Sequence, residues 1–203
     1  QGLPARKPLY TVEDAKHSIK HFRNIKYGKM YTVDDQVKVR YRDAGHIVGA
    51  AIIEMFINDG GKEKKLVFSG DLGQWNIPIV KDPTLISEAD YVFIESTYGD
   101  RIHKDKGKSK ELLLKHISDT YKRGGKLLIP SFAIERTQEL LFAMHKLSKE
   151  GKMPKEKVFL DSPLAIRATK VFNKHHEVYD EEIKKELPEP FNFEGLKFTQ
   201  KAN

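Results

Sequence analysis

Three short strings carry the side chains of this sequence that are best placed to do chemistry. They are DAGHIVG at 43–49, FSGDLG at 68–73 and IESTYGDR at 94–101. Each sets an imidazole or a carboxylate among glycines, and glycine permits the sharp turn and close backbone approach that a metal site requires. His46 and Asp71 are therefore candidate metal ligands. Taken singly, a histidine beside a turn is more often structural, and a Gly-Asp pair is more often an ordinary turn.

Composition excludes several other chemistries. The chain has 203 residues, of which 39% are hydrophobic and 32% charged. This is a globular mixture, and no apolar run approaches the roughly 20 residues of a membrane span. The sequence has no cysteine, so thiol catalysis and disulfides are excluded and any metal must be held by His, Asp or Glu. With no secretory or transit segment at its start, we expect a cytoplasmic protein without membrane contact.

The net charge of +7 is segregated along the chain. Residues 1–42 and 101–126 each carry a net charge of +6, whereas 43–100 carry −6. Lysine-rich faces are commonly just solvated, which is the simpler interpretation. The alternative is a metal-holding centre with phosphate-binding flanks, because divalent ions need carboxylates and a nucleic-acid backbone needs Lys or Arg.

The hydrophobic pattern changes character near residue 91. Before it, the sequence predicts a helix over 10–27 and antiparallel strands over 37–42, 50–57 and 66–69, with a polar connection at 58–65. After it, the predicted strands 91–95, 126–129 and 158–160 are each followed by a loop and a helix, at 109–123, 134–149 and 164–175. We expect a β-rich lobe first, then a parallel-sheet α/β lobe, and no further element in the tail 186–203. Polar residues just past the strand ends mark the edge where such sheets bind ligands.

Together the three strings resemble the metallo-β-lactamase superfamily, and specifically its β-CASP branch of nucleic-acid-processing nucleases. Two further strings, PSFAIERTQE at 130–139 and DSPLA at 161–165, match the β-CASP module. The resemblance spans nearly the whole chain. It implies an α/β (α+β) fold in which residues 1–98 form part of a metallo-β-lactamase αββα lobe and residues 99–203 form part of a parallel-sheet β-CASP lobe.

The resemblance also implies site residues. His46 is a metal ligand, Asp71 is a catalytic residue that bridges two zinc ions, and Glu95 is the first signature residue of the β-CASP module. We expect Glu95 to support the metal site or orient substrate, with a local turn acceptor as the alternative. Arg136, near a helix start after Ser131, is a candidate phosphate contact together with Ser131. Arg101, which closes the third string, is the third candidate substrate-binding residue.

One family string is missing. HxHxDH, which supplies most ligands of the first metal, occurs nowhere in residues 1–203. We therefore expect this chain to be an interior piece of a longer zinc-dependent ribonuclease and to be inactive alone. A non-catalytic RNA-binding or scaffold homologue is the alternative, whereas small-molecule hydrolysis fits the superfamily but not the β-CASP strings. RNA is the expected partner, and single-stranded DNA and homo-oligomer formation stay open.

Overall fold

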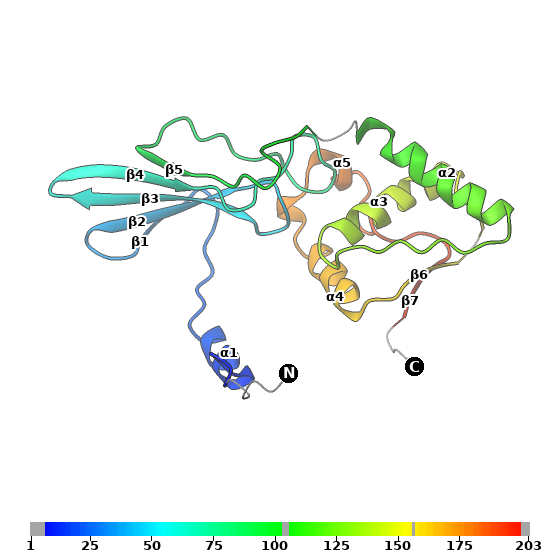
Figure 1. The fold of residues 1–203 in the computed structure, drawn as a ribbon, viewed down its shortest axis with the longest axis horizontal. Coiled ribbons are helices and arrows are strands. Elements are labelled where there is room, and N and C mark those ends of the chain that lie inside the picture. Colours follow the sequence, from blue (N-terminus) through cyan, green and yellow to red (C-terminus); the bar gives the residue numbers. More distant parts are fainter. Residues whose placement is uncertain (1–6, 103–105, 156, 200–203) are drawn as a thin grey trace, which may run out of the picture.

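The computed structural model describes residues 7–102, 106–155 and 157–199. Within them the chain forms a mixed sheet followed by a group of helices and a small second sheet (Figure 1). The elements are α1 (Val12–Ile19), β1 (Met30–Thr32), β2 (Val37–Asp43), β3 (Ala51–Asp59), β4 (Lys62–Phe68), β5 (Tyr91–Phe93), η1 (Lys106–Lys108), α2 (Ser109–Lys122), α3 (Arg136–Lys149), β6 (Val158–Leu160), α4 (Pro163–Phe172), η2 (His176–Val178), α5 (Glu181–Lys184) and β7 (Leu196–Phe198).

The first sheet confirms the predicted antiparallel strands. Its order is β1-β2-β3-β4-β5, and the first four strands pair antiparallel. The polar connection expected at 58–65 is wrong, because β3 and β4 continue into it and leave only Gly60 and Gly61 between them. Both glycines have positive φ, which a two-residue type I′ hairpin turn requires. Lysines can extend β4 here because this end of the hairpin is open to solvent.

The strand predicted at 91–95 joins this first sheet. β5 pairs parallel with β4, placing Val92 opposite Val67. Its apolar run is similar to those at 126–129 and 158–160, which the hydrophobic pattern groups with the later α/β lobe. Pairing with β4 instead brings Glu95, just past the end of β5, beside Ser69, just past the end of β4.

The second sheet corrects two expectations. Residues 126–129 form no strand in the described structure, and Leu128 is exposed. The predicted strand at 158–160 is present as β6, but its parallel partner is β7, in the tail where no element had been expected. β6 is a run of three apolar residues, whereas the middle residue of β7 is Lys197, so β7 has no continuous apolar run to mark it. Its partner lies 38 residues away along the chain.

The helices lie close to their predicted positions except the first. α1 has a capping box in which Thr11 and Asp14 exchange hydrogen bonds, and it ends at Ile19 rather than near residue 27. It buries none of its residues and stands apart from the rest of the molecule (Figure 1). With no packed face to stabilise it, the amphipathic pattern alone sustains only two turns.

The core of the helical half includes residues from the first half of the chain. Ile79 and Val80 are buried in one cluster with residues of α3, α4, α5 and the tail, among them Leu141, Phe172 and Phe191. Backbone hydrogen bonds also join residues 79–80 to the helical half. Asp180 N donates to Ile79 O at 2.9 Å, and Val80 forms an isolated antiparallel bridge with Tyr179. A smaller buried cluster is formed by Ile52 of β3, Val67 of β4 and Ala44, which directly follows β2. The predicted domain boundary at residue 98 stays a prediction.

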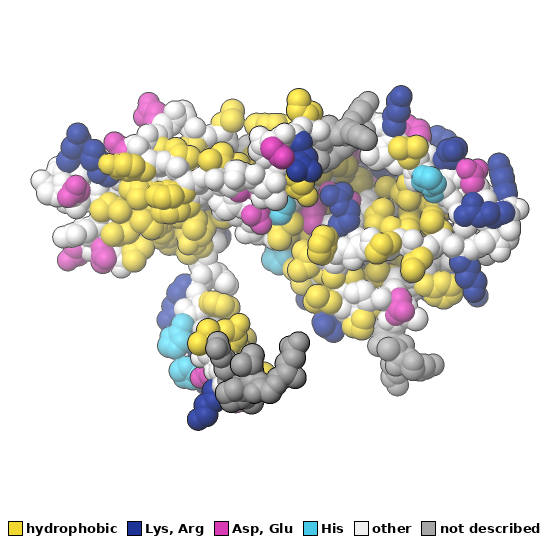
Figure 2. Space-filling view, in the orientation of Figure 1, with side chains coloured by type: hydrophobic (Ala, Val, Ile, Leu, Met, Phe, Trp, Pro, Cys, Tyr) yellow, Lys and Arg dark blue, Asp and Glu magenta, His cyan; other side chains and the backbone are white. Residues whose placement is uncertain are grey.

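Hydrophobic side chains also lie on the surface. Figure 2 shows them gathered over the strands of the first sheet, and Tyr91 and Phe93 of β5 are more than half exposed. The ring of Phe93 stacks on that of Phe68 with centroids 4.7 Å apart. No helix in the described ranges is both long and apolar enough to span a bilayer.

Candidate active site

Two glycine-containing loops meet at one end of the first sheet. The loop at 44–50 joins β2 to β3, and the loop at 69–73 follows β4. Gly73 N donates to Ala44 O at 2.8 Å, and a Cβ on Gly73 would lie only 1.7 Å from Gly45 O. Gly45 has φ +62°, and its Cβ would lie 2.6 Å from Pro83 N. The two loops can therefore touch only because position 73 is glycine, whereas glycine at position 45 lets the first loop pass close to Lys81 and Pro83.

This contact brings His46 and Asp71 together. His46 Nε2 lies 4.0 Å from Asp71 Oδ2, with the side chains 42% and 75% exposed. Two atoms that each lie about 2.0–2.2 Å from one zinc ion are at most about 4.4 Å apart, so the pair fits two ligands of a shared ion. Among the described residues no third His, Asp or Glu completes a metal-binding group. The two candidate ligands therefore lie as close together as one shared ion requires, and the ligand role stays a prediction.

Glu95 connects β5 to the loop that carries Asp71. Its Oε1 accepts from Leu72 N at 2.6 Å, and its Oε2 accepts from the Thr97 hydroxyl at 2.7 Å. Its own N–H donates to Ser69 Oγ at 3.1 Å. The Leu72 N–H, then the Thr97 hydroxyl and more weakly His46, lower the pKa of Glu95. The Thr97 contact is the local turn expected as the alternative, but the Leu72 contact also makes this carboxylate a support for the Asp71 loop.

Asp43 acts on the backbone of the His46 loop. Its Oδ1 accepts from Gly45 N at 2.9 Å, which fixes the turn just before His46. Burial raises the pKa of Asp43, while the Gly45 N–H and Lys81 oppose this. Its role is therefore to shape the loop rather than to meet the imidazole ring, since its hydrogen bond within the described structure goes to Gly45.

The predicted substrate-binding residues are exposed and locally held. Arg101 pairs with its neighbour Asp100 through two contacts of 2.9 and 3.0 Å, and Arg136 pairs with Glu139 one turn along α3. Ser131 Oγ accepts from Thr137 Oγ1 at 3.4 Å. No contact in the described structure joins these three residues to the pair His46 and Asp71. Their roles stay predictions.

Part of the positive charge is already neutralised within the chain. Arg40 and Arg42 both pair with Glu54, and Lys110 pairs with Glu150. Lys104 lies outside the described residues. The basic segments therefore offer a nucleic acid fewer free cations than their net charge of +6 indicates.

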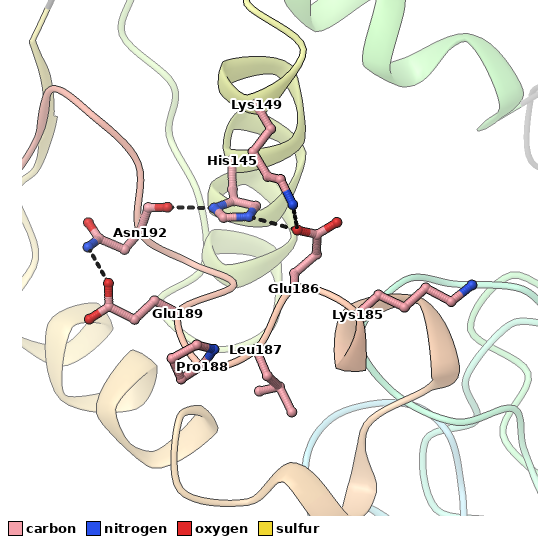
Figure 3. A pocket seen from close by; sticks show the side chains of 8 residues that line it. All are labelled: His145, Lys149, Lys185, Glu186, Leu187, Pro188, Glu189 and Asn192. Carbon is pink, nitrogen blue, oxygen red and sulfur yellow. Dashed lines mark hydrogen bonds and ion pairs between the residues drawn. The ribbon is translucent and has the colours of Figure 1, made fainter.

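A pocket on the helical half is lined by residues of α3 and the tail and by none from the His46 and Asp71 loops (Figure 3). His145 Nδ1 donates to Asn192 O at 2.5 Å, and its Nε2 lies 3.2 Å from Glu186 Oε2. Lys149 Nζ donates to the same carboxylate at 2.5 Å, and Lys149 and His145 both lower the pKa of Glu186, against the effect of burial. These contacts fasten the tail to α3, so His145 has a structural role here.

One residue with a distinctive environment was not assigned a role from the sequence. Glu135, inside the 130–139 string, is buried at the start of α3. Glutamate is not among the residues that ordinarily cap a helix, so no local signal in the sequence marked this position. The structure shows that its side chain makes no capping hydrogen bond.

Comparison with known proteins gives matches along most of the chain. Residues 137–203 match the Beta-Casp domain family. Ribonuclease TTHA0252 of Thermus thermophilus is 32% identical over 197 residues, which cover 96% of this chain and 44% of the relative. The RNase J-like protein of Methanocaldococcus jannaschii is 34% identical over 166 residues, covering 80% and 38%. Transcription termination factor FttA of the same organism is 30% identical over 190 residues, covering 92% and 28%.

These matches, the mixed α+β fold and the loop geometry define a protein of the metallo-β-lactamase superfamily. Within that superfamily, the chain belongs to the β-CASP family. It spans less than half the length of the relatives described above.

Proposed function

We propose that the protein is a zinc-dependent phosphodiesterase that cleaves RNA. The observation that carries this proposal is the approach of His46 Nε2 to Asp71 Oδ2, at 4.0 Å, on two loops that only glycine allows to touch. Relatives named as a ribonuclease and an RNase J-like protein support RNA as the substrate class.

Four residues of this chain would take part in the proposed reaction: His46, Asp71, Glu95 and Arg136. His46 and Asp71 would hold zinc. When bound, zinc supplies Lewis-acid polarisation of the phosphate and lowers the pKa of a water molecule toward ~7. Glu95 holds the Asp71 loop through Leu72 N–H, so the ligand does not have to be ordered when metal binds. Arg136 would contact a substrate phosphate, because a guanidinium and the N-terminal amides of α3 both favour phosphate.

Substitution of Asp71 by Asn tests this proposal in the protein at its natural full length. Cleavage of a labelled RNA should fall by more than about 100-fold, because loss of a residue that merely supports a ligand already costs about 10–100-fold. RNA affinity should change by less than about threefold, because phosphate contacts position the strand independently of the metal. Gel assays measure the cleavage rate, and filter binding measures the affinity.

Asp59→Asn is the matched control. Asp59 is exposed at the far end of the β3–β4 hairpin, so this variant should cleave at the wild-type rate. Chelation should abolish wild-type cleavage, and added zinc should restore it. Continued cleavage by Asp71→Asn contradicts the proposal. A wild-type protein that binds RNA but does not cleave it with zinc present is instead the non-catalytic homologue. Cytoplasmic location, homo-oligomer formation and inactivity of residues 1–203 alone stay predictions.

A further inference from the structure

The start of α3 holds a buried carboxyl group without a hydrogen-bond partner. Glu135 is 8% exposed, and neither of its side-chain oxygens is hydrogen-bonded in the described structure. A buried polar group without a partner is rare and calls for an explanation. Capping of its own helix does not supply one, since the side chain makes no such bond.

The backbone at Glu135 is held in an unfavourable conformation. Its φ and ψ are +66° and −65°, and Arg136 N donates to Ile134 O at 2.9 Å. This is a γ-turn of the rare, strained kind, which glycine adopts much more easily than a residue with a Cβ. Strained residues of this type cluster at functional sites. The carboxyl therefore occupies a position where glycine would be the easier choice.

The carboxyl faces the loop that carries His46. The N–H of Val48 is near enough to lower the pKa of Glu135, although it lies outside hydrogen-bonding geometry. Burial, with a smaller contribution from Glu139, outweighs this effect and raises the pKa to about 8. The group is therefore largely uncharged at neutral pH, which makes its burial without a counter-ion tolerable.

The same loop packs on the core of the helical half. Val48 contacts the cluster that contains Ile79, Leu141 and Tyr179. Glu135 directly precedes α3, whose Leu141 and Phe142 belong to this cluster. Within the loop, Ala44 N donates to Ala50 O at its base, and Ala50 N donates to Ile47 O across the turn that contains Val48. Neither of these two bonds uses the Val48 N–H.

We propose that Glu135 is a positioning residue: its carboxyl accepts a hydrogen bond from Val48 N–H and so fixes the loop that presents His46. Contacts of this kind are often long in the unliganded state and tighten when the site is filled. The link joins the β-CASP helix α3 to the glycine loop of the first sheet. The inference rests on the proposed function only in treating His46 as a zinc ligand.

Two substitutions remove the carboxyl group from the neighbourhood of Val48 and are compatible with the positive φ at position 135. Glu135→Gly relieves the positive φ, and Glu135→Asn shortens the side chain by one methylene while asparagine tolerates positive φ. Glu135→Gln keeps both the length and an acceptor oxygen. The variants are compared in the protein at its natural full length, first by the NMR amide signal and hydrogen exchange of Val48, then by zinc affinity in competition with a chelator.

We expect Glu135→Gly and Glu135→Asn to shift the Val48 amide signal, to speed its exchange and to weaken zinc binding about 10-fold. Glu135→Gln should keep the zinc affinity within about threefold of wild type, because glutamine keeps the length of the side chain and an acceptor oxygen for the Val48 N–H. Glu139→Gln is the charge control: it removes a neighbouring carboxylate and should leave zinc affinity unchanged. If Glu135→Gly fails to fold, Glu135→Asn carries the test.

The outcomes separate this inference from the proposed function. An unchanged Val48 amide signal in both withdrawing variants overturns the inference, whatever the protein cleaves. Unchanged zinc affinity in those variants also overturns it when the wild-type protein binds zinc. If the wild type binds no zinc, the proposed function fails, and the inference is then decided by the Val48 signal and exchange rate alone.

Discussion

Glu54 shows how strongly one residue can depend on its partners. This glutamate of β3 is 1% exposed, and three cations surround it: Arg40 at 2.5 Å, Arg42 at 2.8 Å and Lys65 at 2.7 Å. Strand register creates the arrangement, because Arg40 lies directly opposite Glu54. Burial raises the pKa of Glu54, but the hydrogen bonds from Arg40, Lys65 and Arg42 outweigh it and lower the pKa to about 2.

This pKa predicts a loss of stability in acid. The folded pKa lies below the ordinary value of 4.5, so the stabilisation is fully present above about pH 4.5 and disappears as the pH falls toward about 2. A shift of this size corresponds to about 3 kcal/mol. Urea unfolding at a series of pH values from 7 to 2 measures it.

Glu54→Gln supplies the comparison for this prediction. The variant should be less stable than wild type at pH 7, because three cations lose their counter-charge. The gap between the two proteins should narrow as the pH falls toward about 2, where the wild-type carboxylate becomes half protonated. Glu63→Gln, which alters an exposed glutamate on β4, should follow the wild-type curve. A constant gap between Glu54→Gln and wild type across this range contradicts the prediction.

At the scale of elements, the loops after β2 and β4 form the site by direct backbone contact. We expect Gly73→Ala to lower the free energy of unfolding by about 1–3 kcal/mol or more, since its Cβ would overlap Gly45 O at 1.7 Å. The same change should weaken zinc binding, because it pushes the His46 loop away from Asp71. Urea unfolding and chelator competition measure the two effects.

Gly99→Ala is the control for this element. Its Cβ would lie 3.4 Å from the nearest atom, Ser96 O, so it adds only ordinary contact. It should retain wild-type stability and zinc affinity. If Gly73→Ala is as stable as Gly99→Ala, the two loops are not held together in the way the structure places them.

At the scale of the whole molecule, binding of RNA should depend on salt through the basic segment at 101–126. Each phosphate contact contributes about −0.7 to the slope of log K against log salt for a single strand. Reversing the charge of Lys104, Lys106, Lys108 and Lys110 should therefore flatten that slope. Lys110 already pairs with Glu150. When the four lysines are reversed one at a time, the change at Lys110 should therefore alter the slope least.

Filter binding between about 50 and 200 mM salt measures this effect in the protein at its natural full length. Reversal of Lys170 and Lys174, two exposed lysines at the end of α4, is the control and should leave the slope unchanged. Unchanged affinity and slope after reversal of the four lysines would mean that this segment is a solvated face and that RNA follows another path.

The sequence alone determined the local features of this protein. An alternating pattern predicted β2, an apolar run predicted β3, helical periodicity predicted α2, α3 and α4, and the glycine-containing strings marked His46, Asp71 and Glu95. These succeeded because each signal lies within a few neighbouring residues, where backbone preference and side-chain periodicity act directly.

Only the tertiary structure decided which of these pieces meet. It placed His46 4.0 Å from Asp71, turned Glu95 toward Leu72 N–H and paired β6 with β7 while leaving 126–129 unpaired. It also buried the Glu135 carboxyl at the start of α3 without a hydrogen-bond partner. Such pairings depend on how separate elements pack, and no local pattern in the chain encodes that choice.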